Sequence, residues 1–368
     1  MMSDAPGPLQ GVRVLDLSRL LPGPACSWYL AGMGAQVDRI EGPNGDPARH
    51  MPPFVDGIGA YFAALNRGKR SIAVDLRNAD GIKAVLRLVP HYDVVIEGFR
   101  PGVLEAMGLG PDILLAARAD LVVARISGFG QTGPWANRAG HDLNYVGLAG
   151  VLARETGAAP PPPPPVQVSD FAGALVAAQQ ICASLFARER TGQGAVLDIA
   201  LAQSAMSLMA PLVAALTSEG REPRPNGEAL TGAIPFYDTF KCQDGLLLTV
   251  GSLEPKFQQA LMGVVGADFS REALTSVFAT EPRDVWVERL EGACVAPALG
   301  LNELASHPHW QARKALHSEG STSWVRPPMD CRELQPLPAI GEHTDSILAD
   351  AGLDSQAIRD LRRAGAIH

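Results

Sequence analysis

Short apolar segments recur through the first 200 residues, and stretches with helical spacing separate most of them. The segments expected to form strands are 12–17, 36–41, 71–76, 93–97, 121–126 and 196–199. The stretches expected to form helices include 25–33, 81–88, 103–107 and 171–188. Strands that alternate with helices form a parallel sheet whose two faces are both covered. The alternation therefore predicts a doubly wound α/β domain.

The pattern changes at 222–232, which is polar and rich in glycine and proline. Beyond it we expect a hairpin of strands 236–240 and 246–250 and a helix that starts at Glu254. These shorter elements predict a smaller α+β domain. Other expectations are a single helix over 201–216, an extended spacer at the six prolines 160–165, and an extended chain from about 323 that leads to two short C-terminal helices.

Composition argues against several kinds of partner. The 368 residues carry 31 basic and 39 acidic side chains, and the basic residues are dispersed, so we expect no nucleic-acid partner. No uninterrupted apolar run reaches about 18 residues and no leader pattern is present, so we expect a cytoplasmic protein without membrane association. The five cysteines lie far apart without metal-ligand spacing, which predicts reduced thiols and no metal site. The G-x-G-x-x-G fingerprint is absent after the first strand, which argues against a nicotinamide enzyme.

A titratable pair, His141 and Asp142, lies at the N-terminal end of an apolar stretch with helical spacing. A helix that begins near Asp142 directs unpaired N–H groups and its positive dipole end towards whatever His141 contacts, which suits a developing anion. A histidine side chain exchanges protons near neutral pH. Asp170 is a second carboxylate at a predicted helix start. The alternative for all three residues is a structural role, as helix caps or, for His141, as a core residue.

With these elements assigned, the chain resembles the family III coenzyme A transferases (CaiB/BaiF) over nearly its whole length. The motifs typical of the superfamily are RVLDLSR at 13–19, RGKRS at 67–71, EGFRPGV at 97–103 and SGFGQTGP at 127–134. Three further segments are similar to the α-methylacyl-CoA racemase branch: GHDLNY at 140–145, PFYDT at 235–239 and VGSLEPKF at 250–257. In the transferases a tyrosine commonly occupies the position of His141.

The resemblance implies the architecture. It gives an open Rossmann-like large domain for CoA binding, 1–222 completed by 323–368, and a small α+β domain, 223–322. It also implies an interlocked homodimer, with each site between the large domain of one subunit and the small domain of its partner.

The resemblance also assigns roles to residues. His141 and Asp170 are the two acid/base groups on opposite faces of the substrate α-carbon, Glu254 orients the imidazole, and the N–H groups after Asp142 receive the enolate oxygen. Inversion through a planar enolate needs two such groups in different environments. No cofactor is expected, because the substrate thioester carries the CoA.

Four basic residues are candidates for CoA contacts: Arg39, Lys69, Arg77 and Arg100. Each is equally compatible with a solvated surface charge. A basic residue common in relatives near Ala106 is missing, and Gly42 stands where some relatives carry arginine.

Three functions are compared on this basis. The leading hypothesis is a racemase of 2-methyl-branched acyl-CoA thioesters. The first alternative is a CoA-transferase that acts through an aspartyl-CoA thioester on Asp170. The second is a non-catalytic acyl-CoA-binding protein. His141 favours the racemase, because a transferase has little use for a second base across the α-carbon.

Overall fold

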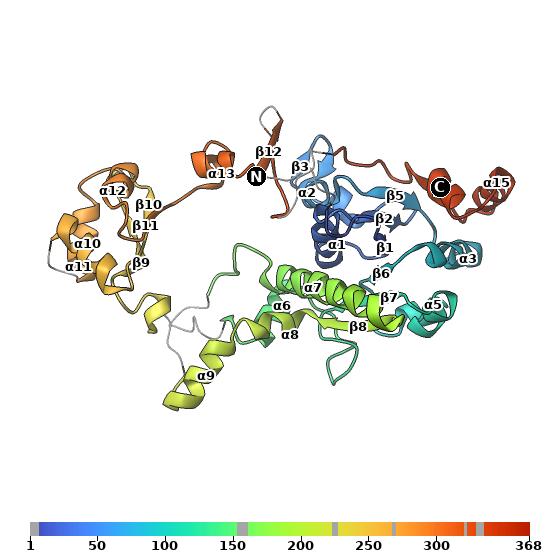
Figure 1. Cartoon of the computed structure of the whole chain (residues 1–368), viewed down its shortest axis with the longest axis horizontal. Helices are drawn as coiled ribbons and strands as arrows, with labels where there is room; N and C mark the ends of the chain where they lie inside the picture. Colours follow the sequence, from blue (N-terminus) through green and yellow to red (C-terminus); the bar gives the residue numbers. More distant parts are fainter. Residues whose placement is uncertain (1–6, 153–160, 223–226, 267–269, 320–321, 329–334) are drawn as a thin grey trace. The chain divides into compact units, whose positions relative to one another are not determined.

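The computed structural model of the chain describes residues 7–152, 161–222, 227–266, 270–319, 322–328 and 335–368. The chain divides into two compact units, and Figure 1 colours it by sequence. Unit 1 consists of Met1–Val151, Pro163–Met209 and Ala315–His368. Unit 2 consists of Leu152–Pro162 and Ala210–Lys314. The predicted domain boundaries, 222/223 and 322/323, lie later in the chain than these limits.

A parallel six-stranded sheet forms the centre of unit 1. Its strands are β1 (Arg13–Asp16), β2 (Gln36–Glu41), β5 (Arg70–Ala73), β6 (Val94–Glu97), β7 (Val122–Ser127) and β8 (Ala195–Ala200). Their order is β5-β2-β1-β6-β7-β8, and all neighbours pair in parallel. In chain order this is third, second, first, fourth, fifth, sixth, the order of a doubly wound dinucleotide fold. The predicted α/β class is confirmed.

Apolar side chains point to both faces of this sheet, as expected for a parallel sheet that helices cover on both sides. Val14 of β1 and Val94 of β6 join one core cluster, whereas their neighbours Leu15 and Val95 join the other. The helices packed into the first cluster include α1 (Pro22–Gly32), α7 (Val168–Thr191) and α8 (Leu201–Ser207). Those of the second include α3 (Ala79–Leu88), α5 (Pro111–Ala117), α14 (Thr344–Asp350) and α15 (Ser355–Arg363).

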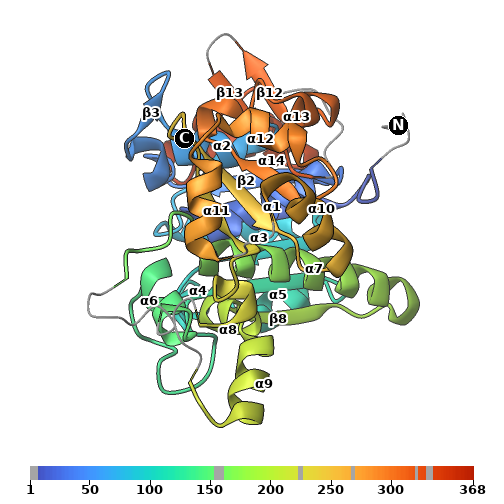
Figure 2. The ribbon, with the colours of Figure 1, turned by 90° about the vertical axis from the view of Figure 1, so that its left-hand side faces the viewer.

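Helix α7 is long and apolar enough, by length and composition, to span a bilayer. In unit 1 it packs as a core helix, with Ala174, Ala177 and Ile181 buried in the first cluster. It runs alongside β8 in Figure 1 and also in the perpendicular view of Figure 2. The expectation of no membrane association stays a prediction.

The single helix expected over 201–216 is wrong, because the structure divides it into α8 and α9 (Ala210–Glu219). Pro211 has no N–H to donate to the carbonyl of Ser207, four residues earlier. In the same turn, the Ser207 hydroxyl donates to the carbonyl of Ser204, at 2.7 Å. Both effects interrupt the helical ladder at Leu208 and Met209.

The C-terminal segment completes unit 1. The N–H of Gly341 donates to the Ser71 hydroxyl, and the N–H of His343 donates to the Ser71 carbonyl. The Thr344 hydroxyl accepts from the N–H of Ala73, so the edge strand β5 is tied to residues far along the chain. The extended chain expected from residue 323 begins instead as a strand of a hairpin, β12 (Leu316–Glu319) with β13 (Thr322–Val325).

Unit 2 is an antiparallel sheet packed against helices. The predicted hairpin is confirmed as β9 (Tyr237–Lys241) and β10 (Leu247–Gly251), and β11 (Val295–Ala298) pairs with β10. Its helices include α10 (Pro255–Val265), α11 (Arg271–Phe278), α12 (Arg283–Arg289) and α13 (Pro308–Ala312). Phe240, Leu248, Phe278 and Trp286 form the centre of its core.

Short elements connect these parts. They are η1 (Pro47–His50), β3 (Phe54–Val55), β4 (Ile58–Gly59), α2 (Ala60–Asn66), η2 (Val89–His91), α4 (Val103–Ala106), α6 (Asp142–Leu148), η4 (Ala229–Thr231) and η5 (Leu301–Glu303). Residues 161–165 of the proline run form neither helix nor strand, and Pro160 lies outside the described residues.

Candidate active site

A cleft of about 480 Å³ opens at the carboxyl ends of β1, β6 and β7 in unit 1. Its walls come from the chain after each strand: 18–23 after β1, 98–101 after β6 and 126–128 around the end of β7. Strand order reverses between β1 and β6, which is where open α/β sheets bind ligands. His141, Asp142 and Asp170 all line this cleft.

The side chain of Asp142 joins the starts of α6 and α7. Its Oδ1 accepts from the backbone N–H of Ser169 at 2.7 Å and from that of Asp170 at 3.0 Å. Two first-turn donors of the 24-residue helix α7 are thereby satisfied by a residue of another helix. The structural alternative for Asp142 was the N-cap of its own helix, but the N-cap of α6 is His141. The sequence indicated a helix start here. The structure adds two hydrogen bonds that join this helix start to that of α7.

Tyr145 holds the first turn of α6 in place. Its hydroxyl donates to the carbonyl of Gly140, and its ring packs edge-on against Phe129 with centroids 5.0 Å apart. A Cβ at Gly128 would lie 2.4 Å from this ring, so only glycine permits the contact. The backbone of His141 is bonded as well: its N–H donates to the Asn144 side chain at 3.0 Å, and its carbonyl accepts from the N–H of Asn144 at 2.8 Å.

Asp170 has an altered acidity. Burial, the larger effect, and the nearby charge of Asp142 together raise the pKa of the Asp170 carboxyl to about 7. The pKa of the Tyr145 hydroxyl is also raised, chiefly because the hydroxyl is buried and then because the Asp170 carboxyl lies nearby. A carboxyl that titrates near neutral pH can serve as base in one direction and as acid in the other.

The four basic residues predicted to contact CoA fall into two groups. Arg100 is exposed and lines the cleft, and Arg77 lines a neighbouring pocket of about 420 Å³, where it pairs with Asp75 at 2.9 Å. Arg39, only 1% exposed, and Lys69 are buried instead.

Arg39 and Lys69 already have internal partners. Arg39 donates to Asn66 and pairs with Asp46. The Lys69 ammonium donates to the Pro24 carbonyl, the Ser27 hydroxyl and the Asn66 side chain at 2.8 to 2.9 Å. A direct ligand contact by Lys69 requires the exchange of one of these bonds, because the ammonium group has only three N–H donors.

Arg19 and Arg138 also line the cleft, and the sequence analysis did not select them. Arg19 lies over the Phe99 ring at 6.0 Å and borders both the cleft and the neighbouring pocket. Arg138 stacks on Trp135 at 4.0 Å. Among the described residues, neither arginine forms an ion pair with a carboxylate, and the same holds for Arg100. The available signal for Arg19 was its place directly after the central strand.

Glu254 lies in unit 2, where it is the exposed N-cap of α10. Its predicted pairing with His141 stays a prediction. Within the described ranges no group of three His, Cys, Asp or Glu side chains has the spacing of a metal site.

The chain belongs to the CoA-transferase family III, whose model matches residues 9–344. It is similar to the α-methylacyl-CoA racemase of Homo sapiens, with 34% identity over 379 residues that cover 96% of each chain. It is also similar to the succinyl-CoA–D-citramalate CoA-transferase of Chloroflexus aurantiacus, with 38% identity over 251 residues, 67% of this chain and 62% of that protein. A solved CaiB/BaiF family protein from Brucella suis has a TM-score of 0.80 and 30% identity, covering 94% of this chain and 100% of that one. The resemblance found in the sequence is confirmed for the family.

Asp170 should make stability depend on pH. Its folded-state pKa, about 7, exceeds the ordinary value of 3.8, so its contribution is fully present below about pH 4 and is lost as the pH rises through 7. Asp170→Asn removes that loss. We expect the variant to gain roughly 2–4 kcal/mol over the wild type between pH 4 and 8.5, since each pKa unit corresponds to about 1.4 kcal/mol.

Urea unfolding at a series of pH values measures this difference. Asp112→Asn, at an exposed first-turn aspartate of α5, is the matched control and should run nearly parallel to the wild type. Parallel curves for Asp170→Asn as well would contradict the raised pKa.

Proposed function

We propose that the protein is a racemase of 2-methyl-branched acyl-CoA thioesters that works by two-base proton transfer. The observation that carries the proposal is the common location of His141 and Asp170 in one cleft, on the starts of two different helices. Racemisation needs two proton-exchanging groups at one carbon, and a single carboxylate does not meet that need. The similarity to α-methylacyl-CoA racemases over nearly the full length supports the same reaction.

The reaction runs through an enolate. One group removes the α-proton, the electron pair of the C–H bond moves into the thioester, and the carbonyl oxygen becomes negative. The N–H groups at the start of α6 are the donors proposed for that oxygen. The other group then returns a proton to the opposite face of the planar carbon. Asp170, with its pKa near 7, is available in both protonation states.

The charges of the cleft fit a CoA thioester. Arg19, Arg100 and Arg138 line it, and guanidinium groups suit phosphate recognition. Arg19 and Arg77 border the neighbouring pocket, which gives a long anionic substrate a second place for its nucleotide end.

The transferase is the second candidate, and the named transferases among the relatives favour it. In that reaction the Asp170 carboxylate attacks the thioester carbonyl, the C–S bond breaks, and CoA leaves as the thiolate. The thiolate then attacks the aspartyl carbonyl of the mixed anhydride and releases the free acid. The aspartyl-CoA thioester passes CoA to a second acid. His141 has no role in these reaction steps.

An isotope experiment separates the two reactions. The protein is incubated with one enantiomer of a 2-methylacyl-CoA in deuterated water, with and without an added carboxylic acid. We expect deuterium at the α-carbon, recovery of both configurations, and no CoA on the added acid.

Two variants test the assigned groups in the same assay. His141→Ala and Asp170→Ala should each lower exchange by about two to four decades, the usual loss for a general acid or base, with circular dichroism unchanged. CoA transfer to the acid without α-exchange would overturn the racemase and support the transferase.

We also propose that Glu254 of one subunit orients His141 of its partner in a homodimer. A carboxylate on the second ring nitrogen holds the imidazole tautomer and raises its basicity. His141→Ala and Glu254→Ala should each be inactive alone, yet mixing them under subunit exchange should restore activity, since one site of each mixed dimer carries neither change. Confirmed exchange without recovery contradicts this arrangement. Lys256→Ala, two residues away and exposed, is the control and should stay active.

A further inference from the structure

Leu20 adopts a backbone conformation that a leucine rarely takes. Its φ is +66°, in the left-handed region where the side chain crowds the following carbonyl. Of the four described non-glycine residues with positive φ, Leu20 is the one that lines the cleft. The side chain is 37% exposed although it is large and apolar. Such a conformation persists only where the surroundings impose it, and these positions concentrate at functional sites.

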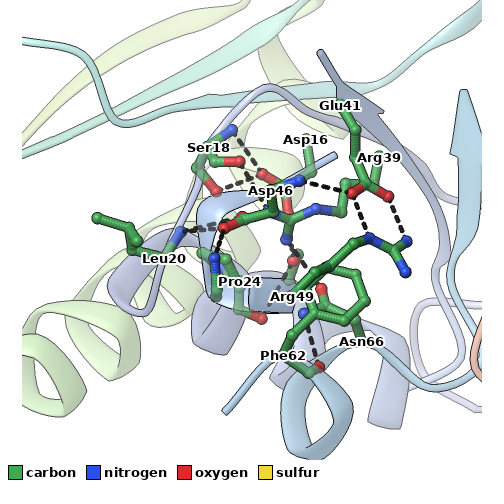
Figure 3. Close-up of polar contacts among 12 residues, drawn as sticks. Asp16, Ser18, Leu20, Pro24, Arg39, Glu41, Asp46, Arg49, Phe62 and Asn66 are labelled. Atoms are coloured by element: carbon green, nitrogen blue, oxygen red, sulfur yellow. Dashed lines mark hydrogen bonds and ion pairs between the residues drawn. The ribbon is translucent and has the colours of Figure 1, made fainter. Parts of the chain in front are cut away.

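Asp46 imposes one side of this conformation. Its carboxylate accepts from the Leu20 N–H at 3.0 Å and from the Ala48 N–H at 2.7 Å. The same carboxylate pairs with the buried guanidinium of Arg39, which also donates to the Ser18 carbonyl at 3.2 Å. Figure 3 shows these contacts around Asp46, with the Leu20 side chain pointing away from the polar group.

Asp16 imposes the other side. It accepts from both the N–H and the hydroxyl of Ser18 and from the Ser27 hydroxyl at 2.5 Å. Lys69 donates in turn to Ser27. The chain from Ser18 to Leu20 is therefore held at the Ser18 N–H, the Ser18 carbonyl and the Leu20 N–H by three buried side chains.

The segment held in this way lines the cleft. Arg19 and Leu20 are exposed there, whereas Leu21 also borders the cleft but is packed into the core with 9% exposure. Two other exposed apolar side chains, Met51 and Tyr61, line the same cleft. A glycine at position 20 would take this conformation without strain, so the conformation alone does not account for a leucine.

We propose that Leu20 is a specificity-determining residue that contacts the apolar part of the bound acyl group, and that Asp46 is the positioning residue that holds it there. The inference rests on the proposed function only in that an acyl-CoA occupies this cleft. An apolar wall of Leu20, Met51 and Tyr61 beside the arginines matches a ligand with an apolar acyl end and an anionic CoA end.

The test is the dissociation constant, measured by calorimetry, for free CoA, acetyl-CoA and a 2-methyldecanoyl-CoA. Binding does not depend on which reaction follows. We expect the wild type to bind the long thioester more tightly than acetyl-CoA. In Leu20→Gly that preference should fall by at least about tenfold, because several buried carbons are lost, while affinity for free CoA stays within about threefold.

Folding is followed in the same samples. Leu20→Gly should melt at or above the wild-type temperature, because glycine relieves the left-handed strain. Asp56→Gly is the matched control: Asp56 is another left-handed non-glycine residue, in the β3–β4 turn and outside the cleft. It should gain a smaller relief, because aspartate tolerates the left-handed region better than leucine does, and it should keep the chain-length preference.

Asp46→Asn tests the positioning role. It should reduce the chain-length preference, and this reduction should vanish in the Leu20→Gly background if Asp46 acts through Leu20. A full preference retained in Leu20→Gly overturns the inference and leaves the proposed function intact. Failure of the wild type to bind any of the three probes overturns both.

Discussion

The carboxylate of Asp142 is the interaction on which the candidate site depends. It accepts the first backbone donors of α7 from a position on α6, so the two helix starts that carry Asp170 and His141 form one unit. It also places a negative charge beside a carboxyl that burial has already made a weaker acid. One side chain therefore holds the helix start that carries Asp170 and adds to the effect of burial on the pKa of that carboxyl.

The sheet gives this pair its place. Strand order reverses between β1 and β6, and the chain leaving these strands diverges and opens the cleft. Buried charges then shape the walls. Asp16 and Asp46 accept hydrogen bonds from the chain after β1 and hold it in place. Two buried cations lie beside these carboxylates: Arg39 of β2 pairs with Asp46, and Lys69, just before β5, donates to Ser27, which in turn donates to Asp16. Buried groups with this many partners are costly to disturb, which makes the wall rigid.

The fold was largely predictable from the sequence because apolar strands and helix starts are local signals. The strand at 36–41 and the helix start at Asp142 were predicted from neighbouring residues alone. The break between α8 and α9 was missed, although Pro211 signals it, because the apolar run continues across it.

The role of each charge was less predictable, because it depends on distant partners. From the sequence, Arg39 and Lys69 were candidates either for CoA contacts or for solvated surface charges, and only the fold places Asp46 and Ser27 beside them. The left-handed backbone conformation of Leu20 could not be predicted from its residue type, because leucine rarely adopts it. The bond from Asp142 to α7 spans 27 residues and depends on how two helices meet.

The most direct test of this account is the pKa of the Asp170 carboxyl, followed by carbon-13 NMR in the wild type and in Asp142→Asn. Both backbone donors bind the same oxygen of Asp142, and an asparagine oxygen can replace it, so the helix starts stay joined while the charge is removed. The account predicts a pKa of about 7 for Asp170 in the wild type and a clearly lower value in the variant. A wild-type value in the ordinary aspartate range, or the same raised value in both proteins, would contradict it.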